Sequence, residues 1–352
     1  MMGPSAQISK IMLGLSALVI VFFIFMDFNL HLRMHNYPID RGTGDNFNFS
    51  YNDVSWLGYN ISPLGDVTVK AVLLDHTNYY LFAPLVTILD NLLNISEFPY
   101  ITPNAISFFH VFVAIASGKC IASDSLSYRR IGVVLFEVRT FLDDLDGHVA
   151  RARKHIKGER SEVGTSGYYI DGVCDGLGCV ALLIGAFFYL KNNPPRGGYV
   201  QLPTVVDNKD SNVIMYKGKI TSQKSAIVIA CFTLQLLLSS LSWNRYIALY
   251  QDMLESNDVS KEEMARQLIV FKSPMFFIVA FFWRLVNVHN MIHLFLIAIF
   301  CDKMWEFLKF IQYIGYGILF SVICVTEKHA MDSRNFIFSQ KYIDSTGNIN
   351  TQ

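Results

Sequence analysis

The sequence predicts an all-α fold, a polytopic membrane helical bundle of about seven spans. Composition is the first indication, because 52% of the 352 residues are hydrophobic and only 16% are charged, whereas an ordinary soluble domain carries about 25% charged residues. The second is that the apolar residues fall in long runs rather than in one-sided helical stripes. Runs of about 18 residues or more with few charges are candidate membrane spans.

The first apolar run, residues 11–26, is interpreted as an uncleaved signal anchor. It is long for a signal peptide, and no small-residue cleavage site closes it. Residues 27–78 are polar and aromatic and look extramembrane. Residues 1–78 are therefore expected to form an N-terminal region with one span and one lumenal segment.

The membrane core is predicted at residues 79–326, followed by a polar C-terminal tail at 327–352. The core begins with an amphipathic helix at 79–95, expected to lie in the membrane interface. Six spans are predicted after it, at residues 104–122, 128–150, 166–190, 223–249, 275–300 and 303–325.

Two segments between these spans are polar. The loop 192–221 contains Pro194-Pro195 and Gly197-Gly198, which predicts a long irregular connection. The charged segment 251–270 is expected to form a short surface helix.

The distribution of lysine and arginine predicts a cytosolic N-terminus. The lysine-rich loop 191–224 would then also be cytosolic, and the glycosylation sequons at Asn48, Asn60 and Asn94 would face the lumen. The basic segment 151–160 disagrees, because this orientation places it in the lumen. Its cations could instead attract an anionic substrate. The net charge of the whole chain is zero, so we expect no nucleic-acid partner.

Two neighbouring spans carry the informative polar residues. They are Asp143, Asp146, Gly147, Ala150 and Arg151 at the end of one span, and Gly167, Asp171 and Asp175 at the start of the next. Each set shares one helical face. Because a short loop joins the two helices, four carboxylates are expected to converge between them.

Four carboxylates in one place require a counter-charge, since an aspartate within a span costs about 2.5–3.5 kcal/mol on insertion scales. One alternative is a helix-end salt-bridge network with Arg151. Hard divalent cations match carboxylate oxygens better. Four carboxylates can hold two metal ions about 4 Å apart, which would neutralise a pyrophosphate and stabilise its displacement.

The pattern Asp-x2-Asp-Gly-x2-Ala-Arg, followed by Gly-x3-Asp-x3-Asp, resembles the signature of the CDP-alcohol phosphotransferase family. Every signature residue is present. The family usually has eight residues between the arginine and the second glycine, whereas residues 152–166 lie there in this chain. Pro103-Asn104 at the start of the first core span is a second point of resemblance, which covers residues 79–325 in all.

The resemblance implies a role for each signature residue. Asp143, Asp146 and Asp171 would bind Mn²⁺ or Mg²⁺, with two ions expected. Asp175 would be the general base for the acceptor hydroxyl and a further metal ligand.

The same resemblance implies a nucleotide site. Gly147, Ala150, Arg151 and Gly167 would line it, with Asn104 nearby, and CMP would be the leaving group. Homodimers are usual in the family.

The signature does not identify the acceptor lipid. The N-terminal anchor, the lumenal segment, the lengthened motif loop and the lumen-facing site together resemble the invertebrate branch of the family. That branch transfers phosphoethanolamine from CDP-ethanolamine to ceramide in the Golgi membrane. The first alternative is an ethanolaminephosphotransferase acting on diacylglycerol. An alternative of another class is a divalent-cation transporter, for which related halves would be expected, and the sequence shows no internal repeat.

The predicted span 275–300 contains Arg284, His289 and His293. Ionisable residues within a membrane are functional candidates, so these three could contact the headgroup or the acceptor. The alternative is a polar stripe packed against neighbouring helices.

Overall fold

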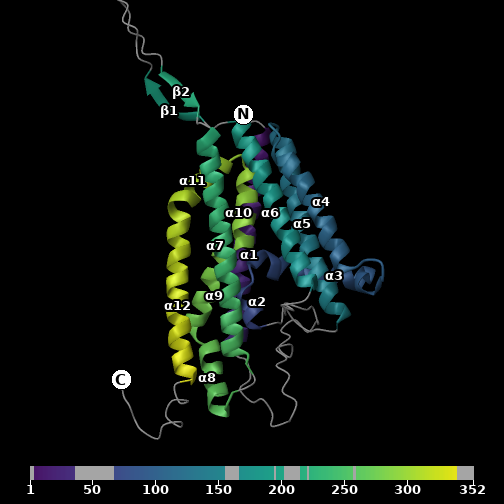
Figure 1. Cartoon of the computed structure of the whole chain (residues 1–352), viewed down its shortest axis with the longest axis vertical. Helices are drawn as coiled ribbons and strands as arrows, with labels where there is room; N and C mark the ends of the chain where they lie inside the picture. The colour runs from purple at the N-terminus through teal and green to yellow at the C-terminus, as the bar shows by residue number, and fades with distance from the viewer. Residues whose placement is uncertain are drawn as a thin grey trace, which may run out of the picture.

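The computed structural model describes residues 4–35, 67–154, 166–193, 196–201, 215–219, 222–256 and 259–338. Long helices run along the long axis of one bundle (Figure 1). The predicted all-α class is confirmed, with one two-stranded hairpin as the addition within the described residues. The α-helices are α1 (Pro4–His35), α2 (Val69–Leu73), α3 (Ala83–Leu93), α4 (Pro103–Ile121), α5 (Leu126–Arg153), α6 (Ser166–Asn192), α7 (Ser222–Leu254), α8 (Lys261–Phe271), α9 (Pro274–Val286), α10 (Val288–Phe300), α11 (Met304–Phe310) and α12 (Tyr316–Phe338).

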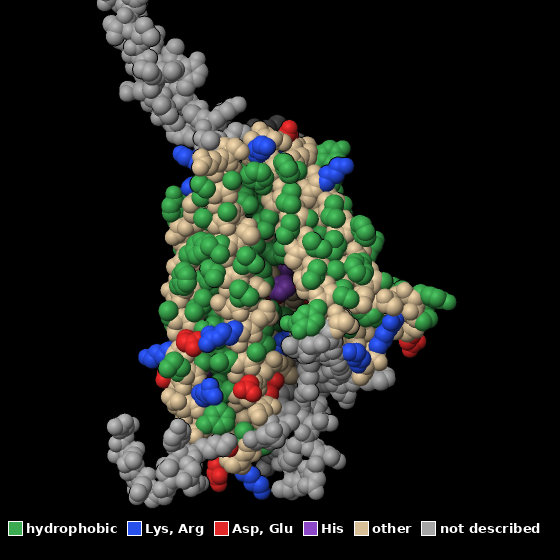
Figure 2. All heavy atoms as spheres, in the orientation of Figure 1, with side chains coloured by type: hydrophobic (Ala, Val, Ile, Leu, Met, Phe, Trp, Pro, Cys, Tyr) green, Lys and Arg blue, Asp and Glu red, His purple; other side chains and the backbone are tan. Residues whose placement is uncertain are grey.

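Five helical segments are long and apolar enough to cross a membrane: Ala6–His35, Pro103–Ile121, Ser166–Asn192, Ser222–Leu254 and Met304–Phe338. The bent pair of α8 and α9 would make a sixth. The chain is therefore a multi-pass membrane protein. Hydrophobic side chains cover the middle of the visible face, and charged side chains gather toward its two ends (Figure 2).

Two of the seven predicted spans differ in the structure. The span expected at 128–150 is α5, which is long but carries too many charges to pass as an apolar span. The span expected at 275–300 is divided into α9 and α10 at Asn287. The Asn287 side chain accepts a hydrogen bond from the Asn290 backbone N–H at 2.8 Å and caps the second helix.

Three further segments show more detail than was predicted. The amphipathic segment at 79–95 is helical as expected, formed by a π-helical turn (Asn78–Phe82), α3 and a short 3₁₀ turn (Ile95–Glu97). The loop expected to be irregular contains the antiparallel strands β1 (Arg196–Gln201) and β2 (Met215–Lys219). The last helix continues to Phe338, beyond the predicted span end at residue 325.

Helices α4, α5 and α6 form the closely packed unit that holds the signature residues. A Cβ on Gly118 would collide with the Ala181 carbonyl, and one on Gly185 would collide with the Gly118 carbonyl. Ser117 donates a hydrogen bond to the Gly132 carbonyl at 2.7 Å, which joins α4 to α5. The small residues thus let three backbones approach closely, as in other membrane helix interfaces.

The N-terminal helix is attached to the core by a buried polar network. Asp27 of α1 accepts hydrogen bonds from Arg284 at 2.6 Å, Tyr80 at 2.7 Å and His76 at 2.7 Å. The Arg284 Nε donates to the Leu74 carbonyl at 2.8 Å. The predicted anchor is therefore an integral part of the bundle.

The two ends of the bundle carry different connecting segments. The start of α1 and the β1–β2 hairpin lie at one end, and α8 lies at the other (Figure 1). At the hairpin end, Arg130 donates to the Ser9 hydroxyl at 2.8 Å. The sequons at Asn48 and Asn60, residues 155–165 and residues 339–352 lie outside the described residues. The homodimer stays a prediction.

Candidate active site and metal centre

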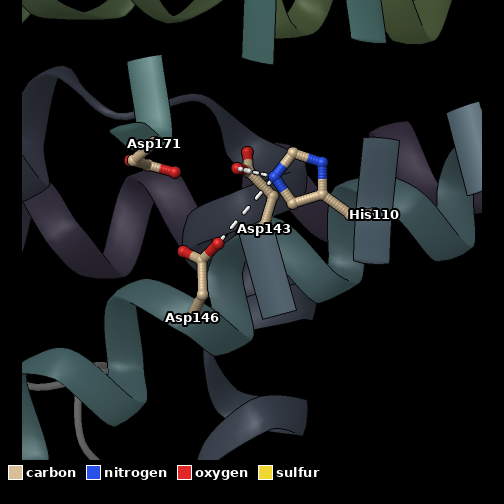
Figure 3. A group of neighbouring side chains, drawn as sticks. All are labelled: His110, Asp143, Asp146 and Asp171. Carbon is tan, nitrogen blue, oxygen red and sulfur yellow. Dashed lines mark ion pairs between the residues drawn. The ribbon is translucent and has the colours of Figure 1, made fainter. Parts of the chain in front are cut away.

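Three predicted aspartates converge with a histidine from a third helix. Asp143 and Asp146 lie on α5, Asp171 lies on α6, and His110 lies on α4. One ligand atom from each of these four residues lies within 4.8 Å of the other three, an arrangement suited to a metal ion. Figure 3 shows the three carboxylates and the imidazole turned toward a common space.

The donor set fits a divalent cation. Carboxylate oxygens suit Mg²⁺ and Mn²⁺, and an imidazole nitrogen suits first-row transition metals. The Asp171 Oδ1 atom and both ring nitrogens of His110 are buried without a hydrogen-bond partner in the described part of the chain. Buried polar atoms are normally paired, so these unpaired atoms point to a bound group.

A hydroxyl from α4 orients one of the carboxylates. Ser107 donates a hydrogen bond to Asp146 Oδ2 at 2.6 Å. Asp146 is itself buried, so this contact fixes the direction in which its carboxylate points. Hydrogen bonds to ligating carboxylates commonly set their orientation.

Asp175 lies next to the cluster but is engaged by Arg139. The Arg139 guanidinium forms an ion pair with Asp175 Oδ1, and its Nη1 lies 3.6 Å from Asp143 Oδ2. The Arg139 side chain is 5% exposed, so this cation compensates two carboxylates inside the bundle. Asp175 Oδ1 also lies 3.9 Å from His110 Nε2.

The predicted nucleotide-site residues lie in two neighbouring pairs. A Cβ added to Gly147 would lie 3.2 Å from Arg151 Nη1, and one added to Gly167 would lie 3.9 Å from Asn104 Oδ1. Ala150 is half-buried one turn from Gly147. Arg151 and Lys70 both interact electrostatically with Asp171, so two cations contribute positive charge at this carboxylate.

The turn between α3 and α4 is fixed to the end of α5. Arg153 donates to the carbonyls of Ser96 at 3.0 Å, Phe98 at 2.6 Å and Ile101 at 2.9 Å. This arginine, which belongs to the segment expected to attract the donor, therefore holds the turn before Asn104.

A second contact joins the same elements. His148 Nε2 lies 3.0 Å from Asp90 Oδ2, and the Ser96 backbone N–H donates to Asp90 Oδ1 at 2.7 Å. Burial alone would raise the pKa of Asp90, but the hydrogen bonds from Ser96 and His148 lower it overall.

The three candidate contacts on α9 and α10 occupy different environments. His293 Nδ1 lies 3.0 Å from Glu137 Oε1. His289 is half-buried and interacts electrostatically with Asp75 and Asp175. Arg284 is 1% exposed and lies in the separate network around Asp27.

Sequence reasoning missed His110, Ser107, Arg139 and Lys70 at this site. His110 had a signal, because it is an ionisable residue within an apolar run, and such residues are functional candidates. Arg139 carries the same signal, because it lies in the predicted span 128–150. Lys70 had no signal, since it lies in the segment expected outside the membrane core.

A multi-pass bundle with carboxylates that face a buried histidine has the features of a metal-dependent membrane enzyme. A family model described as "Ceramide phosphoethanolamine synthase" matches residues 1–340, and the chain belongs to this family. It is 52% identical to a protein named "Ceramide phosphoethanolamine synthase" from Drosophila melanogaster, over 96% of this chain and 98% of the relative. No solved structure matches the chain.

Proposed function

We propose that this protein transfers phosphoethanolamine from CDP-ethanolamine to the primary hydroxyl of ceramide and releases CMP. The convergence of Asp143, Asp146, Asp171 and His110 inside a membrane bundle carries the proposal. The family match and the 52% identical relative support the choice of reaction.

The carboxylates would hold the metal. Asp143, Asp146 and Asp171 are proposed as ligands of Mn²⁺ or Mg²⁺, with Asp175 adjacent for a second ion. When bound, such ions neutralise a pyrophosphate and stabilise the displacement at phosphorus.

The residues around the carboxylates are proposed to bind the nucleotide. Gly147, Ala150 and Gly167 present little side chain, so the CMP portion can approach the helix backbones of α5 and α6. Arg151 and Lys70, which interact electrostatically with Asp171, offer positive charge to the phosphates. Asn104 beside Gly167 supplies an amide at the same edge.

The transfer step requires an acceptor for one proton. The ceramide hydroxyl oxygen forms a bond to the phosphorus that carries ethanolamine, and the bond from this phosphorus to the CMP oxygen breaks. The hydroxyl proton passes to Asp175. Arg139 holds Asp175 Oδ1, so we assign proton acceptance to the other carboxylate oxygen, Oδ2.

The cellular setting belongs to the same proposal. We infer a Golgi membrane protein with its N-terminus in the cytosol and its active site facing the lumen. One contact supports the placement of N-terminus and active site on opposite sides. Arg130 near the start of α5 donates to Ser9 near the start of α1, so the other end of α5, which carries Asp143 and Asp146, points away from the N-terminus.

A donor-by-acceptor matrix tests the reaction. Purified protein would be incubated with CDP-ethanolamine or CDP-choline and with ceramide or diacylglycerol, with Mn²⁺, Mg²⁺ or a chelator. The expected result is ceramide phosphoethanolamine with equimolar CMP, formed only with metal and lost in Asp171→Asn. A product formed only with diacylglycerol would show that the protein is an ethanolaminephosphotransferase and would overturn the proposal. Metal transport without any lipid product would show that the protein is a cation transporter.

A further inference from the structure

His110 belongs to the cluster at the proposed active site, but the proposed reaction gives it no role of its own. Its side chain is fully buried, and neither ring nitrogen has a hydrogen-bond partner among the described residues. Its Nε2 atom faces three carboxylates, at 3.7 Å from Asp143 Oδ1, 3.8 Å from Asp146 Oδ2 and 3.9 Å from Asp175 Oδ1. Figure 3 shows this nitrogen turned toward Asp143 and Asp146.

These separations are too long for hydrogen bonds, which place donor and acceptor at about 2.7–3.2 Å. A charge-assisted pair between an imidazolium and a carboxylate would be shorter still, at about 2.7–2.9 Å. The imidazole is thus surrounded by acceptors without bonding to any of them.

The same separations suit ligands that share one ion. Two ligand atoms that each lie about 2.1 Å from an ion are about 3.0 Å apart at a right angle and about 4.2 Å apart in a straight line. The distances from His110 Nε2 to Asp143 Oδ1 and to Asp146 Oδ2 fall within this interval. Asp175 Oδ1, at 3.9 Å, is engaged by Arg139 instead. The nitrogen and the Asp143 and Asp146 oxygens are therefore spaced for a common cation.

We propose that His110 Nε2 is a direct ligand of the metal centre, which makes the centre a mixed site of carboxylate oxygens and one imidazole nitrogen. The proposal rests on the proposed function for the presence of a metal at this site. Mg²⁺ and Ca²⁺ prefer oxygen ligands, whereas imidazole is a better ligand for transition metals. His110 therefore biases the site toward Mn²⁺ over Mg²⁺.

The ligand assignment has a spectroscopic test that does not depend on turnover. The full-length protein would be purified, freed of metal and loaded with Mn²⁺ below one equivalent. Pulsed electron paramagnetic resonance then detects magnetic coupling between Mn²⁺ and a coordinated nitrogen. We expect a ¹⁴N coupling that changes to a ¹⁵N coupling when the protein is made with ¹⁵N-labelled histidine. This comparison needs no variant, so it holds even if substitutions at His110 prevent folding.

Variants then identify which histidine is bound. The coupling is expected to disappear in His110→Gln and to persist in His148→Gln, a control whose ring lies against Asp90 on α3. Mn²⁺ affinity should fall at least about tenfold in His110→Gln, since changes to groups that merely orient ligands already cost about 10–100-fold. Mg²⁺ affinity, measured by competition, should fall less, so the preference for Mn²⁺ narrows.

The two proposals can fail separately. Bound Mn²⁺ without nitrogen coupling, or coupling that persists in His110→Gln, would overturn the ligand assignment even if lipid transfer is Mn²⁺-dependent. Absence of Mn²⁺ binding would overturn it as well. Nitrogen coupling in a protein that makes no ceramide product would keep the ligand assignment and remove the proposed reaction.

Discussion

Buried polar residues in this bundle fall into two groups with different consequences. In the first group, Asp27 and Arg284 bond to each other and to neighbours at ordinary hydrogen-bond distances. In the second group, His110 and Asp171 keep buried atoms without partners in the described chain. Of the Asp27–Arg284 pair, Arg284 Nη2 alone lacks a partner among the described residues, whereas at the site several unpaired atoms face one space. Unpaired buried atoms are costly unless a ligand satisfies them. The first group therefore holds the fold together, and the second marks the site.

The assignment of the proton acceptor predicts different effects for two neighbouring residues. Asp175→Asn should lower kcat about 10²–10⁴-fold, the usual contribution of general base catalysis. His289→Asn should mainly raise the KM for ceramide, because His289 interacts electrostatically with Asp175 and is not assigned the proton. Steady-state kinetics with ceramide and CDP-ethanolamine separates the two effects.

Asp175→Asn also leaves Arg139 without one of its carboxylates, so its thermal unfolding must be compared with that of wild type. A folded Asp175→Asn protein with nearly normal kcat would show that Asp175 is not the proton acceptor. A large loss of kcat in His289→Asn instead would show that His289 accepts the proton.

Arg284 is expected to act on stability rather than on headgroup binding. Arg284→Met leaves Asp27 buried without its cation, and breaking such a pair costs about 3–5 kcal/mol. The matched control is Arg245→Met, which breaks an exposed pair with Glu327 that is expected to contribute about 0–1 kcal/mol. Thermal unfolding in detergent measures both variants. A stable Arg284→Met protein with a raised KM for CDP-ethanolamine would show that the arginine binds the headgroup.

At the level of helices, long apolar runs were predictable and their interruptions were not. The runs that became α4, α6 and α7 were located to within a few residues of their ends. The break at Asn287 was missed because the helices on both sides of it are apolar overall, which is compatible with one continuous span. An asparagine that caps a new helix through its own side chain is favoured there, and this depends on local geometry that a hydropathy pattern does not carry.

The packing of α4 against α6 predicts sensitivity at one glycine and tolerance at another on the same helix. Gly185→Ala places a methyl group against the Gly118 carbonyl, whereas a Cβ at Gly176 meets no atom within 4 Å. Overpacking of this kind costs about 1–3 kcal/mol, and separating α4 from α6 would also move His110 away from Asp171. Gly176→Ala should be neutral or slightly stabilising, because alanine favours helix more than glycine. Equal unfolding temperatures for the two variants would contradict this packing.

Across the whole molecule, the sequence predicted the half of the site that lies in one continuous signature. The two aspartate-bearing helices are joined by a single loop, so spacing alone showed that their carboxylates converge. His110, Ser107 and Lys70 come from α4 and α2, and the sequence pattern does not show which face of those helices meets α5 or α6. These contacts depend on the tertiary packing of three helices, which only the folded structure provides.

The proposed orientation predicts that the sequons face the lumen. Asn94 is exposed at the C-terminal end of α3, and the Arg153 contacts connect this region to the carboxylate-bearing end of α5. Endoglycosidase treatment should therefore reduce the mass of the wild-type protein made in cells. The triple variant Asn48→Gln, Asn60→Gln and Asn94→Gln should show no shift. A tag inserted within residues 155–165 that is accessible from the cytosol would reverse the orientation.

The central claim is that helices α4, α5 and α6 together build one metal centre. Anomalous diffraction at the manganese edge, from crystals grown with Mn²⁺, tests it directly. We predict a peak at about 2.0–2.3 Å from ligand atoms of Asp143, Asp146, Asp171 and His110, as expected for metal–ligand bonds. Carboxylates that point apart with no peak between them, or Mn²⁺ bound elsewhere in the bundle, would contradict a shared metal centre.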